Sequence, residues 1–429
     1  MTGYRTLARN HDFTVLWIGQ TISELGSRVS MFVFPLLAFH LTHSPIQAGL
    51  VEAAHLLGMC GALLPAGVLA DRTDRLRIMR LTSAAGVLLY ASLVVAGLQH
   101  ALTIPHLVVV ALLTGVANGV FGPAEISAVR AVVTTEELPT ALSQNQARQH
   151  VASLVGGPLG GLLYGVTRWL PFAVDAVSFA ISWVLLGRIR TDLSAPAHAG
   201  PRKSPRADIA EGMRFILERP FFRALLIWAA LSNLVVNGLF FVAIIRLVRA
   251  GFHPAEIGLV ETAAGLGGIL GAIAAPAIID RMATGRLTVL ISWTFVPVVV
   301  PIIFWNNPLV VALALGLGLL LNPAGNAGIS AYAIAQTPSH LQGRVSSATR
   351  FLAMSVMPLA PVLGGLLLST LGGPAAVAAM AVATALTALI PTLSKSVREV
   401  PRPQVWQAEL AAAAEPVEPL VAPPTPVGS

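Results

Sequence analysis

The sequence predicts an all-α integral membrane protein whose twelve transmembrane helices form two homologous six-helix bundles. Three observations indicate this fold class: the composition, a series of long apolar runs and an internal repeat. Of the 429 residues, 55% are hydrophobic and 11% are charged, and the mean hydropathy is +0.75. Because an ordinary soluble domain is about 25% charged, this chain lacks the charge to cover a water-exposed surface. The composition excludes a soluble enzyme, a secreted module and a nucleic-acid binder as descriptions of the whole chain.

Apolar runs long enough to cross a bilayer recur along the chain. A hydrocarbon core about 30 Å thick needs about 20 apolar residues for each helical span. The first run is too long for a signal peptide and lacks a small-residue cleavage site, so we expect it to remain in the protein. The predicted spans are 13–39, 46–70, 78–98, 106–129, 143–166, 172–189, 221–246, 254–279, 287–305, 309–331, 345–369 and 375–393.

The distribution of positive charge predicts the orientation. An even number of spans puts both termini on one side of the membrane. With the termini in the cytoplasm, 23 of the 27 Lys and Arg residues fall in inside segments, and the outside segments hold Arg168, Arg246 and Arg249. Lys and Arg are enriched in cytoplasmic loops, so both termini are expected there. Only Lys203 and Lys395 are lysine, and this Arg-rich composition indicates a bacterial inner-membrane protein.

An internal repeat indicates duplication. Gly49–Ala54 recurs as Gly258–Ala263, 209 positions later, and Pro45 matches Pro254 at the same offset. Parallel duplication of this kind is typical of secondary transporters with a central site between the halves. The predicted organisation is a cytoplasmic N-terminus (1–12), an N-terminal bundle (13–189), a cytoplasmic linker with a short amphipathic helix (190–220), a C-terminal bundle (221–394) and a disordered cytoplasmic tail (395–429).

The loop after the second span carries a recognisable motif. It reads Gly67-Val-Leu-Ala-Asp71-Arg72-Thr-Asp-Arg75-Leu-Arg77. This resembles the loop 2–3 signature of the major facilitator superfamily, Gly-x-Leu-Ala-Asp-Arg-x-Gly-Arg-Arg, with Asp74 replacing the second glycine and Leu76 replacing an arginine. The first span, from Ile18 to Arg28, is similar to the macrolide-efflux and enterobactin-exporter-like branch of that superfamily. The resemblance covers about residues 10–395.

The resemblance implies a cytoplasmic gate. In the family the aspartate of this motif is a gate element, so Asp71 is expected to latch the halves, with Arg130 as its partner. Gly67, Arg72 and Arg75 belong to the same loop, and Asp280 with Arg281 forms a second copy 209 residues on. The alternative is that these residues anchor the loop at the lipid headgroups.

Two helices carry Gly/Pro clusters. Gly156-Gly157-Pro158-Leu-Gly-Gly161 is similar to the Gly-Pro-x-x-Gly-Gly antiporter motif but is one residue short. A second cluster has the full spacing, from Pro361 to Gly364 and Gly365. The motif favours an antiporter. Close helix packing through small residues explains the clusters equally well.

Charged side chains inside the spans are costly and indicate function. Glu24 lies near the middle of the first span, and Arg28 is one turn further on the same face, so the two can pair. A carboxyl group in apolar surroundings binds a proton more readily than in water. Glu24 is therefore our first candidate for a proton carrier or a contact for a cationic substrate. The alternative is a permanent structural bridge between Glu24 and Arg28.

Further polar candidates come from the repeat and from the helices expected to line the cavity. Glu52 and Glu261 occupy equivalent positions of the repeat. One interpretation is that they carry protons, and the other is that they have a symmetric structural role. His55 shares a face with Glu52, but one Glu-x-x-His unit does not make a metal site, so no metal or cofactor is expected. The resemblance implies that spans 4, 7 and 10 line the cavity, where the polar residues are Asn118, Asn233, Asn237, Asn322 and Asn326.

These features predict a secondary transporter that exports small, partly lipophilic compounds (drugs, natural products or siderophores) in exchange for protons by alternating access. The sequence has no Gly-x-x-x-x-Gly-Lys-Ser/Thr loop, so ATP is not expected to be the direct energy source. The expected partners are a small-molecule substrate, protons and the bilayer, without nucleic acid, and the protein is expected to be a monomer. A lipid or lysophospholipid transporter, or an importer, of the same fold is the close alternative. An intramembrane enzyme or sensor is the distant one, because no nucleophile or metal constellation is present.

Overall fold

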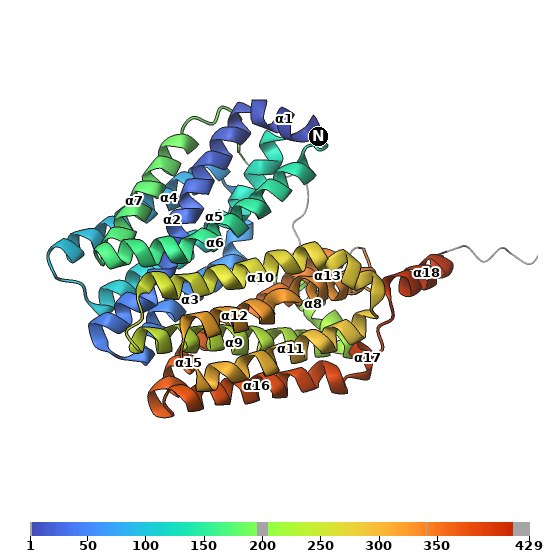
Figure 1. Ribbon diagram of the computed structural model, residues 1–429. Coiled ribbons are helices and arrows are strands. Elements are labelled where there is room, and N and C mark those ends of the chain that lie inside the picture. Colours follow the sequence, from blue (N-terminus) through green and yellow to red (C-terminus); the bar gives the residue numbers. More distant parts are fainter. Residues whose placement is uncertain (1, 195–204, 340, 415–429) are drawn as a thin grey trace, which may run out of the picture.

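The computed structural model describes residues 2–194, 205–339 and 341–414. Regular secondary structure in these residues is helical throughout, and the helices form two bundles that follow one another in the chain (Figure 1). The N-terminal bundle comprises α2 (His11–Thr42), α3 (Pro45–Arg72), α4 (Arg75–Leu98), α5 (Ile104–Val132), α6 (Leu138–Val166) and α7 (Leu170–Leu186), preceded by α1 (Thr2–Arg9).

The C-terminal bundle repeats this order with two interrupted helices. It comprises α9 (Pro220–Arg249), α10 (Pro254–Arg281), α11 (Thr284–Phe304), α12 with α13 (Pro308–Leu320, Asn322–Ala335), α14 with α15 (Gln342–Ser355, Leu359–Thr370) and α16 (Gly373–Leu393). The linker helix α8 (Pro205–Glu218) covers the segment in which a short amphipathic helix is predicted. Every predicted span coincides with one of these helices or helix pairs.

Ten segments in the described part of the chain are helices long and apolar enough to cross a membrane. Two of the twelve predicted spans are not among these ten segments, and they correspond to α6 and α7. Helix α7 is apolar but has only 17 residues. Helix α6 has 29 residues, and its first half is polar, with Gln144, Asn145 and Arg148. The twelve-helix fold class predicted from the sequence is confirmed.

Proline fixes where several helices begin. Pro45, Pro220, Pro254 and Pro308 each occupy the first helical position, where the missing N–H costs no hydrogen bond and the fixed φ suits the helix. Because Pro45 and Pro254 are 209 residues apart, the repeat makes α3 and α10 start at equivalent positions, and the two helices also end at equivalent residues.

Two seams of small residues join the bundles. In one seam α3 packs on α15, where Gly49 faces the Pro361 backbone and Gly365 faces the Pro45 backbone. In the other, α6 packs on α10, where Gly161 faces the backbone of Pro254. A β-carbon at any of these glycines would overlap backbone atoms of the other bundle, so only glycine permits the approach.

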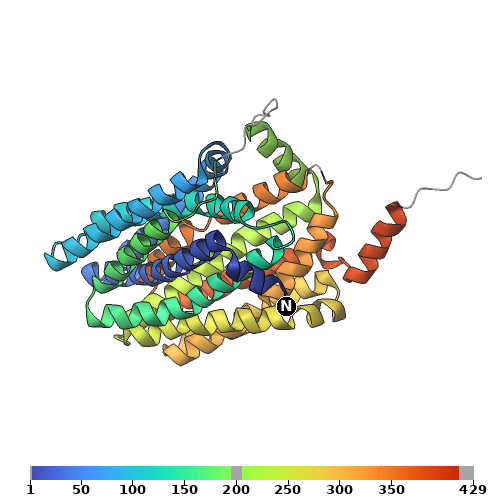
Figure 2. The ribbon, with the colours of Figure 1, turned by 90° about the horizontal axis from the view of Figure 1, so that it is seen from above.

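The seams lie on one side of the molecule, near the starts of α3 and α10. From there the two bundles diverge (Figure 1) toward the end that carries the N-terminus, α8 and α18 (Pro403–Ala414) (Figures 1 and 2). We call that end the terminal face. The structure therefore holds the bundles together on the side away from the terminal face.

An interrupted helix contributes a polar contact between the bundles. Pro358 follows the end of α14 and has no N–H to donate to the carbonyl of Met354. That oxygen accepts from the Met357 N–H at 3.0 Å and also accepts a weak hydrogen bond from the Cys60 thiol of α3, at 3.5 Å. The neighbouring carbonyl of Ala353 accepts from Asn233 of α9, at 3.3 Å. The break in this helix thus supplies backbone acceptors to both bundles.

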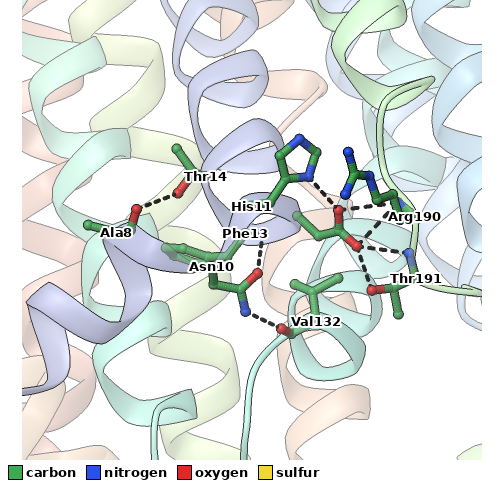
Figure 3. Close-up of polar contacts among 9 residues, drawn as sticks. Ala8, Asn10, His11, Phe13, Thr14, Val132, Arg190 and Thr191 are labelled. Atoms are coloured by element: carbon green, nitrogen blue, oxygen red, sulfur yellow. Dashed lines mark hydrogen bonds and ion pairs between the residues drawn. The ribbon is translucent and has the colours of Figure 1, made fainter.

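A set of hydrogen bonds closes the N-terminal bundle at the terminal face (Figure 3). The Asp12 carboxylate accepts from the Arg190 N–H at 3.2 Å, the Thr191 N–H at 2.8 Å and the Thr191 hydroxyl at 2.6 Å. The Asn10 amide donates to the Val132 carbonyl at 2.6 Å. These contacts tie the start of α2 to the end of α5 and to the segment after α7.

The tail prediction is wrong for the residues that follow Lys395. Helices α17 (Lys395–Arg398) and α18 (Pro403–Ala414) form there, and Val397 and Trp406 are buried. The Gly285 N–H at the start of α11 donates to the Val400 carbonyl at 3.0 Å. Apolar side chains spaced along this segment dock it on the C-terminal bundle, which composition alone did not reveal. Residues 415–429 of the predicted tail lie outside the described residues.

Replacing the buried carboxylate of the terminal face should weaken the fold. Asp12→Ala removes the acceptor of the hydrogen bonds from Arg190, Thr191 and His11, and bonds to a charged group contribute about 1.5–3 kcal/mol each. We expect the free energy of unfolding to fall by at least about 2 kcal/mol, measured as a lower melting temperature in detergent. Glu136→Ala, at an exposed acid near the same face, is the control and should change little. Equal effects of the two substitutions would contradict the role of Asp12.

Enlarging a seam glycine should part the bundles. In Gly258→Leu a β-carbon would come within 2.7 Å of the Pro158 nitrogen, and overpacking costs about 1–3 kcal/mol. Cys60, 5% exposed in the α3 seam, reports the parting. We expect its rate of modification by a thiol reagent to rise about tenfold, the equivalent of about 1.4 kcal/mol.

Gly268→Leu is the matched control on the same helix, because a β-carbon at Gly268 meets nothing within 4 Å. Unchanged Cys60 modification in Gly258→Leu, with the protein folded, would show that this seam does not hold the bundles together.

Candidate functional site

A cavity of about 220 Å³ lies between the bundles, and helices from both bundles line it. Helices α2 and α3 contribute from the N-terminal bundle, and α9 and α10 contribute from the C-terminal bundle. Its polar and charged residues are Arg28, Glu52, His55, Asn237 and Glu261. Its aromatic residues are Phe32, Phe34, Phe240 and Phe241. The walls therefore combine a few ionisable groups with aromatic faces, as ligand sites commonly do.

Two repeat-related carboxyl groups meet in this cavity. Glu52 lies on α3 and Glu261 lies at the equivalent position on α10. They are close enough for the charge of Glu261 to act on Glu52. Two carboxylates in one apolar site repel each other, so the site favours a shared proton or a bound cation. The duplication thus puts one acid from each bundle at the same place.

Arg28 is a cation in the lining of this cavity and pairs with Glu24. Its Nε donates to the Glu24 carboxylate at 3.0 Å, one turn earlier on α2. Its charge also acts on Glu261 in the other bundle. The pairing of Glu24 with Arg28 expected from their spacing is present in the structure. Arg28 has, in addition, a second acid within electrostatic reach across the bundle interface.

The Gly156-Gly157 pair of α6 makes room for this arrangement. A β-carbon at Gly156 would overlap the side chain of Arg28, and one at Gly157 would lie 2.8 Å from a carboxylate oxygen of Glu261. The two glycines thus accommodate the cation on one side and the acid on the other. The predicted antiporter-like residues Gly157, Pro158 and Gly161 lie on α6, and Pro361, Gly364 and Gly365 lie on α15. These two helices form the seams, so close packing accounts for their small residues.

His55 is the buried base of the cavity. It is 4% exposed, and its Nδ1 lies 3.2 Å from the Ala111 carbonyl of α5. Its Nε2 is enclosed without a hydrogen-bond partner. The bond to Ala111 orients the ring, and the free nitrogen belongs to a side chain that lines the cavity. Among the described residues no cluster of three or more His, Cys, Asp or Glu side chains could hold a metal ion.

One of the five predicted asparagines lines the cavity. Asn237 does so, and its amide donates to the Asn233 carbonyl at 2.7 Å. Asn322 instead lines a small separate cavity within the C-terminal bundle. The Asn326 amide donates to the Asn322 side chain at 2.5 Å, and Asn118 is half-buried on α5 outside the lining.

The structure describes only part of the predicted gate. The side chains of Gly67, Asp71 and Arg72 lie outside the described residues, so the latch between Asp71 and Arg130 stays a prediction. Arg130 is exposed at the terminal face, and the Arg75 N–H donates to the Leu193 carbonyl at 3.3 Å. Of the second copy, Asp280 and Arg281 are exposed, and Asp280 accepts from Gln404 of the tail at 3.4 Å.

Sequence reasoning missed a buried ion pair beside the cavity. Arg148 is one of the 23 cations that the sequence places in the inside segments, but it is 4% exposed and donates to Glu125 at 2.6 Å. The periodicity of α6 carried the signal. Residues on one face of this helix are buried, namely Ala141, Asn145, Arg148, Ala152 and Gly156. Hydropathy alone places the start of this span at residue 143, and it does not reveal that these residues share one buried face.

Asp175 is a second buried acid in the N-terminal bundle. It is 0% exposed on α7 and accepts from the Ser178 hydroxyl at 3.0 Å. A β-carbon at Gly26 of α2 would lie 2.5 Å from its carboxylate. The contact places Asp175 in the packing between α2 and α7.

Two six-helix bundles, an acid from each and a cavity between them define a membrane transporter with a central site. The family model described as "Major Facilitator Superfamily" matches residues 16–361. The chain therefore belongs to the major facilitator superfamily, a family of transporters rather than enzymes.

Curated relatives extend along most of the chain. The multidrug efflux pump Tap of Mycolicibacterium fortuitum is 29% identical over 405 residues, which cover 90% of this chain and 94% of the relative. The multidrug efflux pump Tap of Mycobacterium tuberculosis (strain H37Rv) is 25% identical, with 92% and 96% covered.

Solved structures share the fold. A bacterial homologue of the human lysosomal transporter Spinster, in an inward-facing and unoccupied conformation, superposes with a TM-score of 0.68 at 15% identity, covering 91% of this chain and 96% of that one. A bacterial homologue of the iron transporter ferroportin, in an inward-facing state, superposes with a TM-score of 0.67 at 17% identity, covering 90% and 98%. At these identities the likeness concerns the fold.

Proposed function

We propose that the chain is a proton-coupled exporter of small lipophilic compounds that works by alternating access. The observation that carries this proposal is the meeting of Glu52 and Glu261 in one cavity. Each acid belongs to a different bundle, so a proton or a substrate cation bound there contacts both moving parts. Export as the direction is supported by the relatives named as multidrug efflux pumps.

The lining of the cavity supports the substrate class. Four phenylalanines offer apolar and aromatic contact, and the acids Glu52 and Glu261 offer negative charge. An aromatic face attracts a cation, so neutral and positively charged lipophilic compounds fit, whereas anions with several charges do not. Within the cavity lining, Arg28 is the charged residue of opposite sign, and Glu24 holds it at 3.0 Å.

The orientation follows from the charge bias of the loops. With the Arg-rich segments in the cytoplasm, the terminal face is cytoplasmic and the seams are on the outer side of a bacterial inner membrane. The structure then corresponds to a state closed to the outside. Protonation from the outside neutralises the acids between the bundles, and binding of substrate from the cytoplasm or inner leaflet displaces the proton.

Coupling is tested by dye accumulation in cells. Efflux-deficient bacteria expressing the chain should accumulate less ethidium and rhodamine 6G than cells without it, and a protonophore should abolish the difference. Glu24→Gln should weaken export about tenfold or more, because Arg28 loses its hydrogen-bonded partner and an unpaired charge inside a membrane span is costly. Glu136→Gln, at an exposed acid outside the spans, is the matched control and should export normally.

Unchanged accumulation of every compound, with the protein present in the membrane, would contradict export of drug-like compounds. Uptake of lysophospholipid by the same cells would then identify a lipid importer of this fold. Export that persists with the protonophore would contradict the coupling.

A further inference from the structure

Arg148 has hydrogen-bond donors that nothing in this state uses. The side chain is 4% exposed, and its Nη2 donates to Glu125 at 2.6 Å. Its Nε and Nη1 are enclosed without a hydrogen-bond partner. A guanidinium group carries five N–H donors, and enclosed donors without acceptors are destabilising. Arg148 can therefore hold a second carboxylate in addition to Glu125.

The packing of α2 on α6 brings Glu24 close to Arg148. The two helices run in the same direction, with Gly156 against Arg28 and Gly160 against Val29. One turn nearer the terminal face, this alignment sets the buried Ala152 beside Glu24. Arg148 follows one further turn along α6, a rise of about 6 Å, which an arginine side chain spans. The charge of Glu24 also acts on Glu125, the present partner of Arg148.

The ionisable groups near Glu24 come from most of the helices packed around it, and cations are few among them. Helix α9 contributes the uncharged Asn237 to the cavity. The titratable and charged groups are Arg28 on α2, Glu52 and His55 on α3, Glu125 on α5, Arg148 on α6, Asp175 on α7 and Glu261 on α10. Arg28 and Arg148 are the cations of this set.

We propose that Arg148 is the second partner of Glu24 and receives its carboxylate when Arg28 turns to Glu261. This inference rests on the proposed proton-coupled transport and assigns to Arg148 a positioning role in it. Arg28 pairs with Glu24 in this state and lies within electrostatic reach of Glu261 in the other bundle. When Arg28 leaves, Glu24 either takes a proton or finds another cation. Arg148 supplies that cation, so that it and the proton compete for the same carboxylate.

The test uses a double substitution that leaves no unpaired charge. Arg148→Met alone would strand Glu125 in the bundle, whereas Glu125→Gln with Arg148→Met removes both charges. The readout is the pH dependence of rhodamine 6G binding to purified protein, followed by fluorescence polarisation. An opposite charge nearby shifts the protonation of a carboxyl group by about 1–3 pH units. We expect the midpoint of the profile to rise by at least about one unit in the double variant.

The shift should depend on Glu24. In a Glu24→Gln background, adding the double substitution should leave the profile unchanged, a result that a merely structural ion pair would not give. The same shift with and without Glu24, or no shift in a double variant that retains its melting temperature, overturns the proposal. Arg148→Lys keeps the positive charge and tests the proposal if the double variant does not fold: a rise smaller than about one unit is expected, and no change overturns it.

The pH profile of the unsubstituted protein distinguishes a failure of proton coupling from a failure of the role of Arg148. A flat pH profile there overturns the proton coupling itself, and with it the role of Arg148. A sloped profile that the double substitution leaves in place overturns the role of Arg148 alone.

Discussion

Ionised side chains inside a bilayer are stable only where they are paired or hydrogen-bonded, and Arg28 is where this constraint acts most directly. It holds Glu24 of its own helix at 3.0 Å and lies within electrostatic reach of Glu261 in the other bundle. A change in the distance between the bundles therefore changes which acid is neutralised. In this account the pairing of Arg28 links a movement of whole bundles to the protonation of single carboxyl groups.

The seams make that movement possible. Glycines at the α3–α15 and α6–α10 contacts let backbones touch, and a contact between backbones offers little side-chain interlocking to hold it. The hydrogen bonds of Asp12 and Asn10 tie the start of α2 to neighbours in its own bundle. The N-terminal bundle is thus internally fastened, while the interface between the bundles is built from small residues. Such a division suits two rigid bodies that rock about a central site.

The sequence predicts much of the fold because the fold follows from hydropathy, proline positions and duplication. Starts such as Pro45 and Pro254 are set by local chemistry, and each predicted span has its helix. The meeting of Glu52 and Glu261 was less accessible. The repeat marks them as equivalent, but only the packing of the two bundles brings both side chains into one cavity.

Other features needed the structure because they depend on contacts between distant segments. From the sequence, Arg148 is counted among the cytoplasmic charges, because the buried face of α6 is not evident and its partner Glu125 is 23 residues away. The tail reads as disordered until Val397 and Trp406 are seen docked on the C-terminal bundle. Of the five asparagines chosen by helix number, Asn237 reaches the cavity, since helix assignment does not settle which face points inward.

The central claim is that the acids Glu52 and Glu261 exchange a proton for substrate. It is tested most directly by adding rhodamine 6G to purified protein in a weakly buffered solution and following the pH with an indicator dye. The account predicts that binding releases protons from the unsubstituted protein and that Glu52→Gln combined with Glu261→Gln lowers the release. Equal release from both proteins, or binding without release in the unsubstituted one, would contradict it.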